Sequence, residues 1–295
     1  GSFEDVAEAV VQTLLTSDTT DLEALGELSA IGHCLPHGGE YHSDPVGGED
    51  LLTALEAAGL EGHPQNECAL EGIRAFSNLA PDVPQGVVFE TGFFASLPPR
   101  AFLYPVPYGW YEEYGLRKYG RQGLVHRQAA LLASAHLKEP LDELDLITCC
   151  LGPETSMALI RDGQAIDTSG GLEGLPGAQT CGDIDCGLLF EATRAMNTDI
   201  EELEGALRDE SGLRGLAGYD GDISQILEAA SDGNEDAQRA LDVYCYRIRK
   251  SLGAYHAIAG EVDALVMAGP WASGHPELRA YVCADLEHLG ILVDA

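Results

Sequence analysis

The stretch DTSGGLEGLPGAQTCGDIDCG (Asp167–Gly187) says more about this chain than any other. It holds six glycines and four acidic residues in 21 positions. Glycine allows a positive φ and a close approach of the backbone to a ligand. The stretch therefore predicts loops at the mouth of an α/β site, where phosphate or sugar groups bind. A site for anions normally includes a cation, yet this stretch has no lysine, arginine or histidine.

The composition predicts a folded, strongly acidic protein. The chain has 295 residues, enough for two domains, and 45% of them are hydrophobic. Its 49 acidic and 16 basic residues give a net charge of −33. The acids are spread along the chain, which favours a solvated acidic surface adapted to high salt over an ordinary acidic protein. Nucleic acid and anionic membranes are poor partners, because both require a basic face.

The cysteines give no sign of a disulfide framework. None of the eight forms a CxxC pair, and no signal-peptide pattern is recognisable, so we expect reduced thiols and a cytoplasmic location. A zinc site that uses Cys181 and Cys186 is a weaker alternative. No hydrophobic run reaches the length of a membrane span.

Hydrophobic periodicity predicts an α/β fold in which strands end in glycine-bearing turns. An Asp162-Gly163 turn joins two of the strands in a hairpin. We expect an irregular segment over 98–107, a buried strand at 262–269, and the following elements. The other strands are 29–35, 86–90, 144–152 and 155–167; the helices are 3–29, 50–60, 67–80, 126–137, 187–196, 199–209, 223–231, 234–260 and 276–288.

Several blocks of sequence occur in an order that is typical of one family. They include GHCLPHGGE (32–40), PQNECALEGI (64–73), VVFETGFFASLP (87–98), RKYGRQGLVHR (117–127), CLGPETS (150–156), GDID (182–185) and VDALVMAG (262–269). With these blocks the chain resembles the acetate kinase family, the short-chain carboxylate kinases of the actin-like ATPase superfamily.

The resemblance implies two actin-like (ribonuclease H-like) α/β domains with an interdomain cleft in which ATP and a carboxylate meet. The first domain would comprise residues 1–90 and 274–295, and the second residues 91–273. ATP, Mg²⁺ and a homodimer are implied with the fold.

The family pattern extends beyond this chain at both ends. It begins with a strand that bears an NxGSSSLK phosphate loop and ends with a further strand and helix, whereas this sequence runs from Gly1 to Ala295. We therefore expect a truncated first domain, unless a second polypeptide supplies the missing strands.

At the catalytic positions that the resemblance implies, most residues differ from the family's. Two family arginines correspond to Cys34 and Thr180, and two histidines to Gln65 and Gln122. The family aspartate corresponds to Glu90, which keeps a carboxylate. Replacing an arginine by cysteine or threonine removes a bidentate cation, and such a loss lowers the rate by about 10³–10⁵ in related chemistries.

The other implied site positions differ as well. Asp183 and Asp185 are the metal candidates, while Asn66, His37 and His126 keep polar side chains. In the nucleotide loop a proline removes an amide donor and a glutamate adds negative charge. The carboxylate pocket corresponds to Pro36, Pro64 and Arg121, and the nucleotide-binding positions to Cys150, Leu151, Gly152, Pro153, Glu154, Asp222, Ile223, Ser224, Gly269, Pro270, Trp271, Ala272 and Ser273.

Three hypotheses follow. The first is a catalytically silent homologue that acts as a binding, regulatory or structural protein. The second is an active carboxylate kinase with a remodelled site, in which Glu90 acts near the phosphoryl group and Asp183 and Asp185 hold Mg²⁺. The third is a chain that works together with a second polypeptide, and it is compatible with the first.

Overall fold

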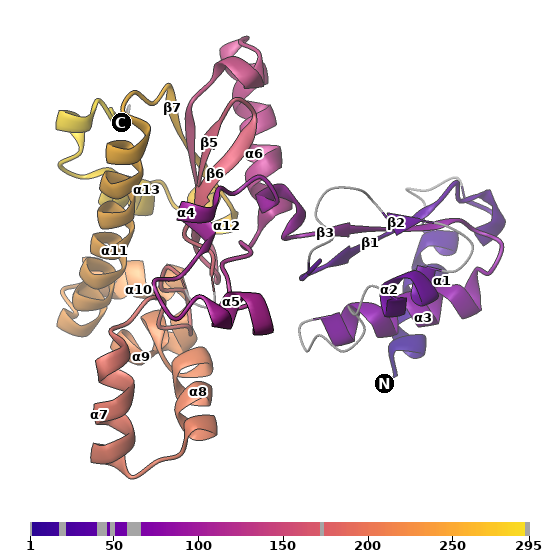
Figure 1. The fold of residues 1–295 in the computed structure, drawn as a ribbon, viewed down its shortest axis with the longest axis horizontal. Coiled ribbons are helices and arrows are strands. Elements are labelled where there is room, and N and C mark those ends of the chain that lie inside the picture. Colours follow the sequence, from indigo (N-terminus) through magenta and orange to yellow (C-terminus); the bar gives the residue numbers. More distant parts are fainter. Residues whose placement is uncertain are drawn as a thin grey trace. The chain divides into compact units, whose positions relative to one another are not determined.

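A computed structural model shows that the chain forms two compact units, Gly1–Ala95 and Ser96–Ala295 (Figure 1). Each unit has its own sheet and its own core. The structure describes residues 2–17, 22–39, 46–47, 51–57, 66–171 and 174–292.

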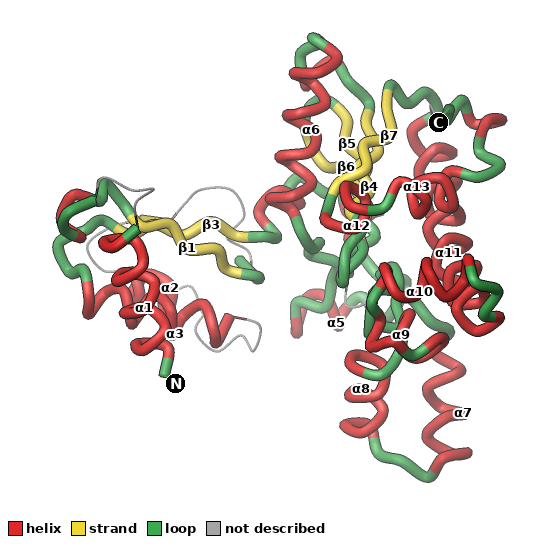
Figure 2. The backbone as a smooth tube through the Cα atoms, turned by 180° about the vertical axis from the view of Figure 1, so that it is seen from behind, coloured by secondary structure: helices red, strands yellow, loops and turns green. Residues whose placement is uncertain are grey.

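In unit 1, three helices lie on one side of a three-stranded sheet (Figures 1 and 2). The strand order is β1-β3-β2, with β1 and β3 parallel and β2 antiparallel to β3. Leu35, Ile73 and Val87 are fully buried between sheet and helices. The elements are β1 (Ile31–Leu35), β2 (Val46–Gly47), β3 (Gln85–Phe89), α1 (Phe3–Thr16), α2 (Leu51–Ala57) and α3 (Glu67–Leu79).

Unit 2 is built around a four-stranded sheet with the order β6-β5-β4-β7. Strands β4, β5 and β6 form an antiparallel meander, and β7 lies parallel to β4 at the edge. Asp162 and Gly163 both have positive φ and make the turn between β5 and β6, as their residue types predict. The strands are β4 (Leu146–Cys150), β5 (Ser156–Arg161), β6 (Gln164–Thr168) and β7 (Ala264–Ala268).

Helices cover both faces of this sheet. Helix α6 (Gly123–Leu137) contacts β4, β5 and β7, and the long α11 (Glu235–Ala259) packs on the other face, where it contacts β5 (Figure 1). Helices α7 and α8 form a pair that projects away from the sheet (Figure 2). The remaining helices are α4 (Pro99–Phe102), α5 (Gly109–Tyr114), α7 (Cys186–Met196), α8 (Ile200–Asp209), α9 (Gly212–Ala217), α10 (Ile223–Ser231), α12 (Pro270–Gly274) and α13 (Pro276–Cys283).

The main core of unit 2 lies between the sheet and α11. Tyr244, at the middle of α11, is 1% exposed. Its hydroxyl is 2.7 Å from Thr155 Oγ1, and its ring packs edge to face against Trp271. A buried phenol needs such a partner, so this contact ties α11 to the segment between β4 and β5.

The structure corrects the predicted positions of several segments. Residues 276–283 pack in unit 2, where Leu278 and Val282 are fully buried in the α11 core; the predicted domain division placed 274–295 in the first domain. The strand predicted to be buried at 262–269 is only half-buried, because β7 is an edge strand. The helix predicted over 3–29 ends at Thr16, and the segment 98–107 contains the short helix α4.

In the described residues no helix combines the length and the apolar composition that a membrane crossing requires.

We predict that Tyr244→Phe lowers the free energy of unfolding by about 1 kcal/mol, because a buried hydrogen bond to Thr155 is lost. Urea denaturation followed by circular dichroism measures the change. Tyr246→Phe is the matched control: Tyr246 lies on the same helix and is 61% exposed, so its change should stay within about 0.5 kcal/mol. Equal effects of the two variants would contradict the role of the Thr155 contact.

Candidate functional site

In unit 1, polar groups gather where the parallel strands β1 and β3 end. Asn66 is fully buried; its side chain accepts from the His37 amide at 3.0 Å and donates to the His37 carbonyl at 2.8 Å. Thr91 Oγ1 accepts from the Gly38 amide at 3.0 Å. Because ligands of α/β proteins bind at the carboxyl ends of parallel strands, these contacts form a supported loop at the position expected for a site.

Cys34 and Glu90 face each other at this end of the sheet. Cys34 Sγ lies 3.7 Å from Glu90 Oε1, to which it donates. Partial burial, together with the negative charge and the hydrogen bond of Glu90, raises the pKa of the Cys34 thiol to about 11. The thiol is therefore neutral at physiological pH, so Cys34 brings no positive charge to this end of the sheet.

Other predicted residues of unit 1 are placed as follows. Pro36 is exposed in the bend after β1. Pro64 and Gln65 lie outside the described residues. His33 Nε2 bonds Gln85 Oε1 at 2.7 Å, whereas His37 Nδ1 accepts from the Gly39 amide.

In unit 2, five separate segments line a pocket of about 850 Å³. Its volume lies in the range of pockets that hold small molecules and cofactors. The sequence predicted eight of its lining residues from scattered positions, including Thr180. The lining residues are Pro153, Glu154, Ala178, Gln179, Thr180, Arg208, Asp209, Asp220, Gly221, Asp222, Ile223, Ser224, Pro270, Trp271 and His275.

Backbone contacts fix the walls of this pocket. The Ala178 amide donates to the Pro153 carbonyl at 2.8 Å, and the Ala178 carbonyl accepts from Arg214 N at 2.8 Å. Gly212 and Gly221 have φ of +60° and +76°, and a Cβ at either would overlap the carbonyl oxygen of Gly177 or Ala178. Only glycine fits these two positions, so the 177–180 loop is held against the segment 212–221.

The pocket carries charges of both signs. Arg208 is paired with Asp209 at 3.2 Å and lies 3.9 Å from Glu204. His275 Nε2 is 3.5 Å from Ser224 Oγ. Neither Arg208 nor His275 belongs to a sequence block that pointed to the site: Arg208 comes from the end of α8 and His275 from the junction of α12 and α13.

The carboxylate of Asp222 is engaged as the N-cap of α10. It accepts from the amides of Ser224 and Gln225 at 2.9 and 3.1 Å. These hydrogen bonds lower the pKa of Asp222. The negative charge of Asp222 therefore interacts with the amides at the N-terminus of α10.

Six predicted nucleotide-binding residues do not line this pocket. Cys150, Leu151 and Gly152 are buried behind it. Ala272 is buried in α12, while Gly269 and Ser273 line a different groove.

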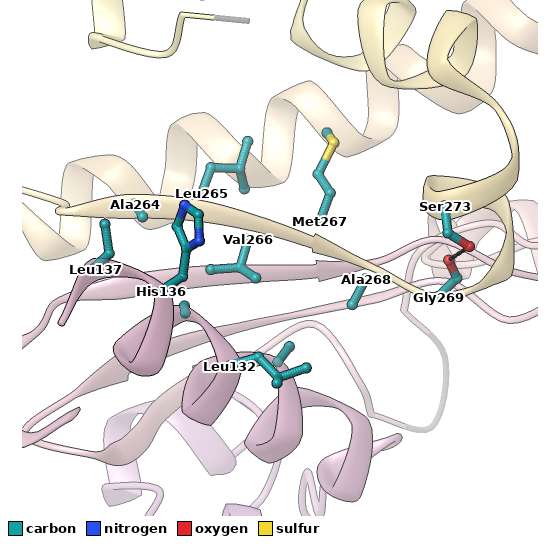
Figure 3. A pocket seen from close by; sticks show the side chains of 12 residues that line it. Leu132, His136, Leu137, Ala264, Leu265, Val266, Met267, Ala268, Gly269 and Ser273 are labelled. Atoms are coloured by element: carbon teal, nitrogen blue, oxygen red, sulfur yellow. Dashed lines mark hydrogen bonds between the residues drawn. The ribbon is translucent and has the colours of Figure 1, made fainter. Parts of the chain in front are cut away.

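That second groove, about 640 Å³ in volume, runs between α6 and β7 (Figure 3). The side chains of Leu132 and His136 reach into it from α6, and Ser273 donates to the Gly269 carbonyl at 3.1 Å. Its lining is apolar apart from His136 and Ser273 and includes no lysine, arginine or acid. This chemistry does not suit a polyphosphate.

The glycine-rich stretch 167–187 receives its cations from elsewhere in the fold. Lys118 Nζ donates to the Thr168 carbonyl at 2.9 Å and lies 3.9 Å from Asp167 Oδ1. Arg247 donates to the Asp183 carbonyl at 3.2 Å. Burial raises the pKa of both Asp167 and Asp183, and the Lys118 charge opposes the shift.

The metal candidates do not form a metal-binding cluster. Asp185 caps α7 by accepting from the Gly187 amide at 2.7 Å. Among the described residues no three His, Cys, Asp or Glu side chains are grouped in a way that could hold a metal ion. Cys181, a candidate for zinc, donates to the Gly182 carbonyl at 3.1 Å.

Two further predicted residues lie at the start of α6. Gln122 has a positive φ of 56° and is the N-cap of the helix, and its side chain bonds Ser156. The Arg121 amide lies against Gly170, where a Cβ would come within 2.7 Å of it. Behind them, the fully buried His126 bonds Thr148 and Ser156.

Comparison with known proteins gives a consistent result. The family model described as the Acetokinase family matches residues 1–295. The acetate kinase of Caldicellulosiruptor saccharolyticus is 37% identical over 98% of this chain and 74% of its own length; that of Halothermothrix orenii is 37% identical over 97% and 73%. The crystal structure of Porphyromonas gingivalis acetate kinase superposes with a TM-score of 0.90 at 33% identity, covering 98% of this chain and 74% of that one.

A solved propionate kinase is similar in the same way. The protein from Francisella tularensis superposes with a TM-score of 0.90 at 29% identity, over the whole of this chain and 76% of its own. These likenesses confirm the predicted α/β fold of the acetate kinase structures.

We predict that Cys34 reacts slowly with iodoacetamide at pH 8, because only a small fraction of the Cys34 thiol is ionised when its pKa is about 11. Glu90→Gln should lower that pKa and speed the reaction several-fold. Mass spectrometry of tryptic and Glu-C peptides follows each cysteine, and Cys68, an exposed thiol of the same unit, is the internal reference. A Cys34 rate that Glu90→Gln leaves unchanged would contradict the coupling.

We predict a loss of stability on acidification that depends on His126. Burial lowers its pKa from 6.5 to about 4. The neutral ring therefore contributes stability that is complete above pH 6.5 and lost as the pH falls towards 4, by roughly 3 kcal/mol in all. Urea denaturation at pH 7 and pH 5 measures the difference. His126→Gln should abolish this part of the pH dependence, whereas His136→Gln, at an exposed position of the same helix, should retain it.

Proposed function

The chain belongs to the acetokinase family, and on this premise we propose that it transfers the γ-phosphoryl group of ATP to a short-chain carboxylate. The Pγ–O bond to ADP breaks and a bond from Pγ to the carboxylate oxygen forms, which yields an acyl phosphate and ADP. Acetate is the first candidate acceptor, because the similar curated proteins are acetate kinases.

The observation that carries the proposal is the 850 Å³ pocket of unit 2. Positions implied by the resemblance, scattered from residue 153 to residue 271, meet there around one cavity. Residues near Pro270 and Trp271 offer apolar surface for a base, and Ser224, Gln179 and Thr180 offer polar groups for a ribose. The cavity therefore fits the base and the ribose of a nucleotide in size and chemistry.

The pocket supplies little positive charge for a triphosphate. Glu154, Asp209 and Asp220 line it together with the cation Arg208, which is already paired. Mg²⁺ keeps most of its waters and binds through substrate phosphates with one or two carboxylates. The described acids do not form a separate metal cage, so we propose that any Mg²⁺ enters with the nucleotide.

A second candidate function is a catalytically silent homologue. One observation favours it: a neutral thiol that donates to Glu90 stands at one family arginine position, and a threonine stands at the other. Phosphoryl transfer depends on positive charge around the transferring oxygens.

We predict that the purified 295-residue chain forms acetyl hydroxamate from ATP, acetate, Mg²⁺ and hydroxylamine above the enzyme-free rate, in low salt or molar KCl. Its kcat should be low, because two arginine positions are neutral. Failure to form product, together with no ATP or ADP binding by calorimetry, would overturn the proposed kinase function. Binding without turnover would favour the silent homologue.

Cys34→Arg should raise kcat at least about tenfold, because it restores a cation at a position that stabilises the transferring group. Cys68→Arg is the matched control, since it adds the same charge at another exposed cysteine of unit 1. An equal gain from both variants would show that the effect comes from net charge and not from the position of the arginine.

A further inference from the structure

Four side chains of unit 2 form one continuous line of hydrogen bonds from the centre of the sheet to the start of α6. Thr148 Oγ1 is 2.7 Å from His126 Nδ1, and His126 Nε2 is 2.8 Å from Ser156 Oγ. Ser156 Oγ in turn bonds Gln122 Oε1. Thr148 and His126 are fully buried and Ser156 is 2% exposed, so only the Gln122 end reaches the surface.

The chemistry of the groups fixes the direction of each bond. With Gln122 Oε1 turned towards Ser156, the carboxamide oxygen can only accept, so Ser156 donates to Gln122. The single hydroxyl proton of Ser156 is then used, and its oxygen accepts from His126 Nε2–H. A neutral imidazole carries one N–H, so Nδ1 must accept from the Thr148 hydroxyl. In this arrangement the Gln122 amide group faces away from Ser156.

The reverse direction is less favourable at both ends of the line. It would turn Gln122 Oε1 towards the Glu154 carbonyl, which now lies 3.5 Å from Gln122 Nε2, and two acceptors would face each other. At the other end, Thr148 would gain only a long bond of 3.4 Å to the Ala158 carbonyl. Burial keeps the imidazole neutral, as both directions require.

We propose that His126 is a positioning residue: through Ser156 it holds the Gln122 carboxamide with Oε1 towards Ser156 and Nε2 beside the Glu154 carbonyl. The carboxamide nitrogen has two N–H groups, and the second is then a donor for an oxygen of the transferred phosphoryl group. The identity of the ligand rests on the proposed kinase function. The direction of the hydrogen bonds from Thr148 to Gln122 does not depend on that function. In this chain a neutral donor of fixed orientation takes the position of a family histidine.

The first test determines which ring nitrogen of His126 carries the proton, and it needs no catalysis. Nitrogen-15 NMR of histidine-labelled protein at pH 7 should show His126 protonated on Nε2, and Ser156→Ala should shift the Nε2 resonance. A ring protonated on Nδ1 would reverse the direction and overturn the proposal.

The second test detects whether the Gln122 side chain contacts a bound ligand. Addition of ADP with inorganic phosphate should shift the Gln122 side-chain amide resonance in the wild-type protein. The Gln122 resonance is assigned by its absence in Gln122→Glu. An unmoved Gln122 amide under saturating nucleotide would overturn the assignment of its donor role, even where His126 has the expected tautomer.

The third test uses turnover. Gln122→Glu keeps the shape and the acceptor for Ser156 but replaces the outward N–H by a carboxylate oxygen, so kcat should fall by about 10² or more with a small change in acetate KM. Ser156→Ala should lower kcat by about tenfold, because the carboxamide can then rotate. Ser134→Ala, elsewhere on α6, should leave kcat unchanged.

Full activity of Gln122→Glu would show that this position presents an acceptor, and would overturn the proposal. Absence of turnover in every protein, with the expected tautomer and the ADP and phosphate shift present, would instead overturn only the kinase function.

Discussion

Strand β4 is buried at all five residues between β5 and β7, and its alternating side chains serve both parts of the unit 2 site. Ile147 and Cys149 face the core shared with α11. Thr148 faces α6 and bonds His126. Because successive side chains of a strand point to opposite faces, a shift of one residue in register would place the threonine in the apolar core and break the line to Gln122.

Local chemistry made most of the fold predictable. The Asp162-Gly163 turn, the periodicity of α11 and the strands predicted at 29–35 and 86–90 were visible in residue types alone. The structure confirms these elements, with the two strands at 31–35 and 85–89. The half-burial of β7 was not predictable, since it depends on which strand lies at the sheet edge and not on the apolar composition of 264–268. The place of α13 likewise depends on a tertiary contact, that of Leu278 with the unit 2 core.

The candidate site was predictable where a motif marked it. Eight of the positions that came from blocks of known order share one pocket, whereas six predicted nucleotide-binding residues lie outside it. Arg208 and His275 were not found, because each comes from an ordinary helix end with no local signal. The stretch 167–187 contains no cation of its own, but Lys118 and Arg247 contact it from segments that are distant in the sequence. Their partners are carbonyls and carboxylates of the protein itself.

The contacts of Gly212 and Gly221 with the 177–180 loop also determine how the pocket can respond to a ligand. The wall consists of main chain against main chain, with no side-chain rotamers between them that could adjust. Its conformational entropy is therefore lost when the protein folds and not when a ligand arrives, so binding carries a small ordering penalty. Such a preorganised wall limits adaptation, because a larger side chain at either glycine would displace the whole loop and alter the pocket in one step.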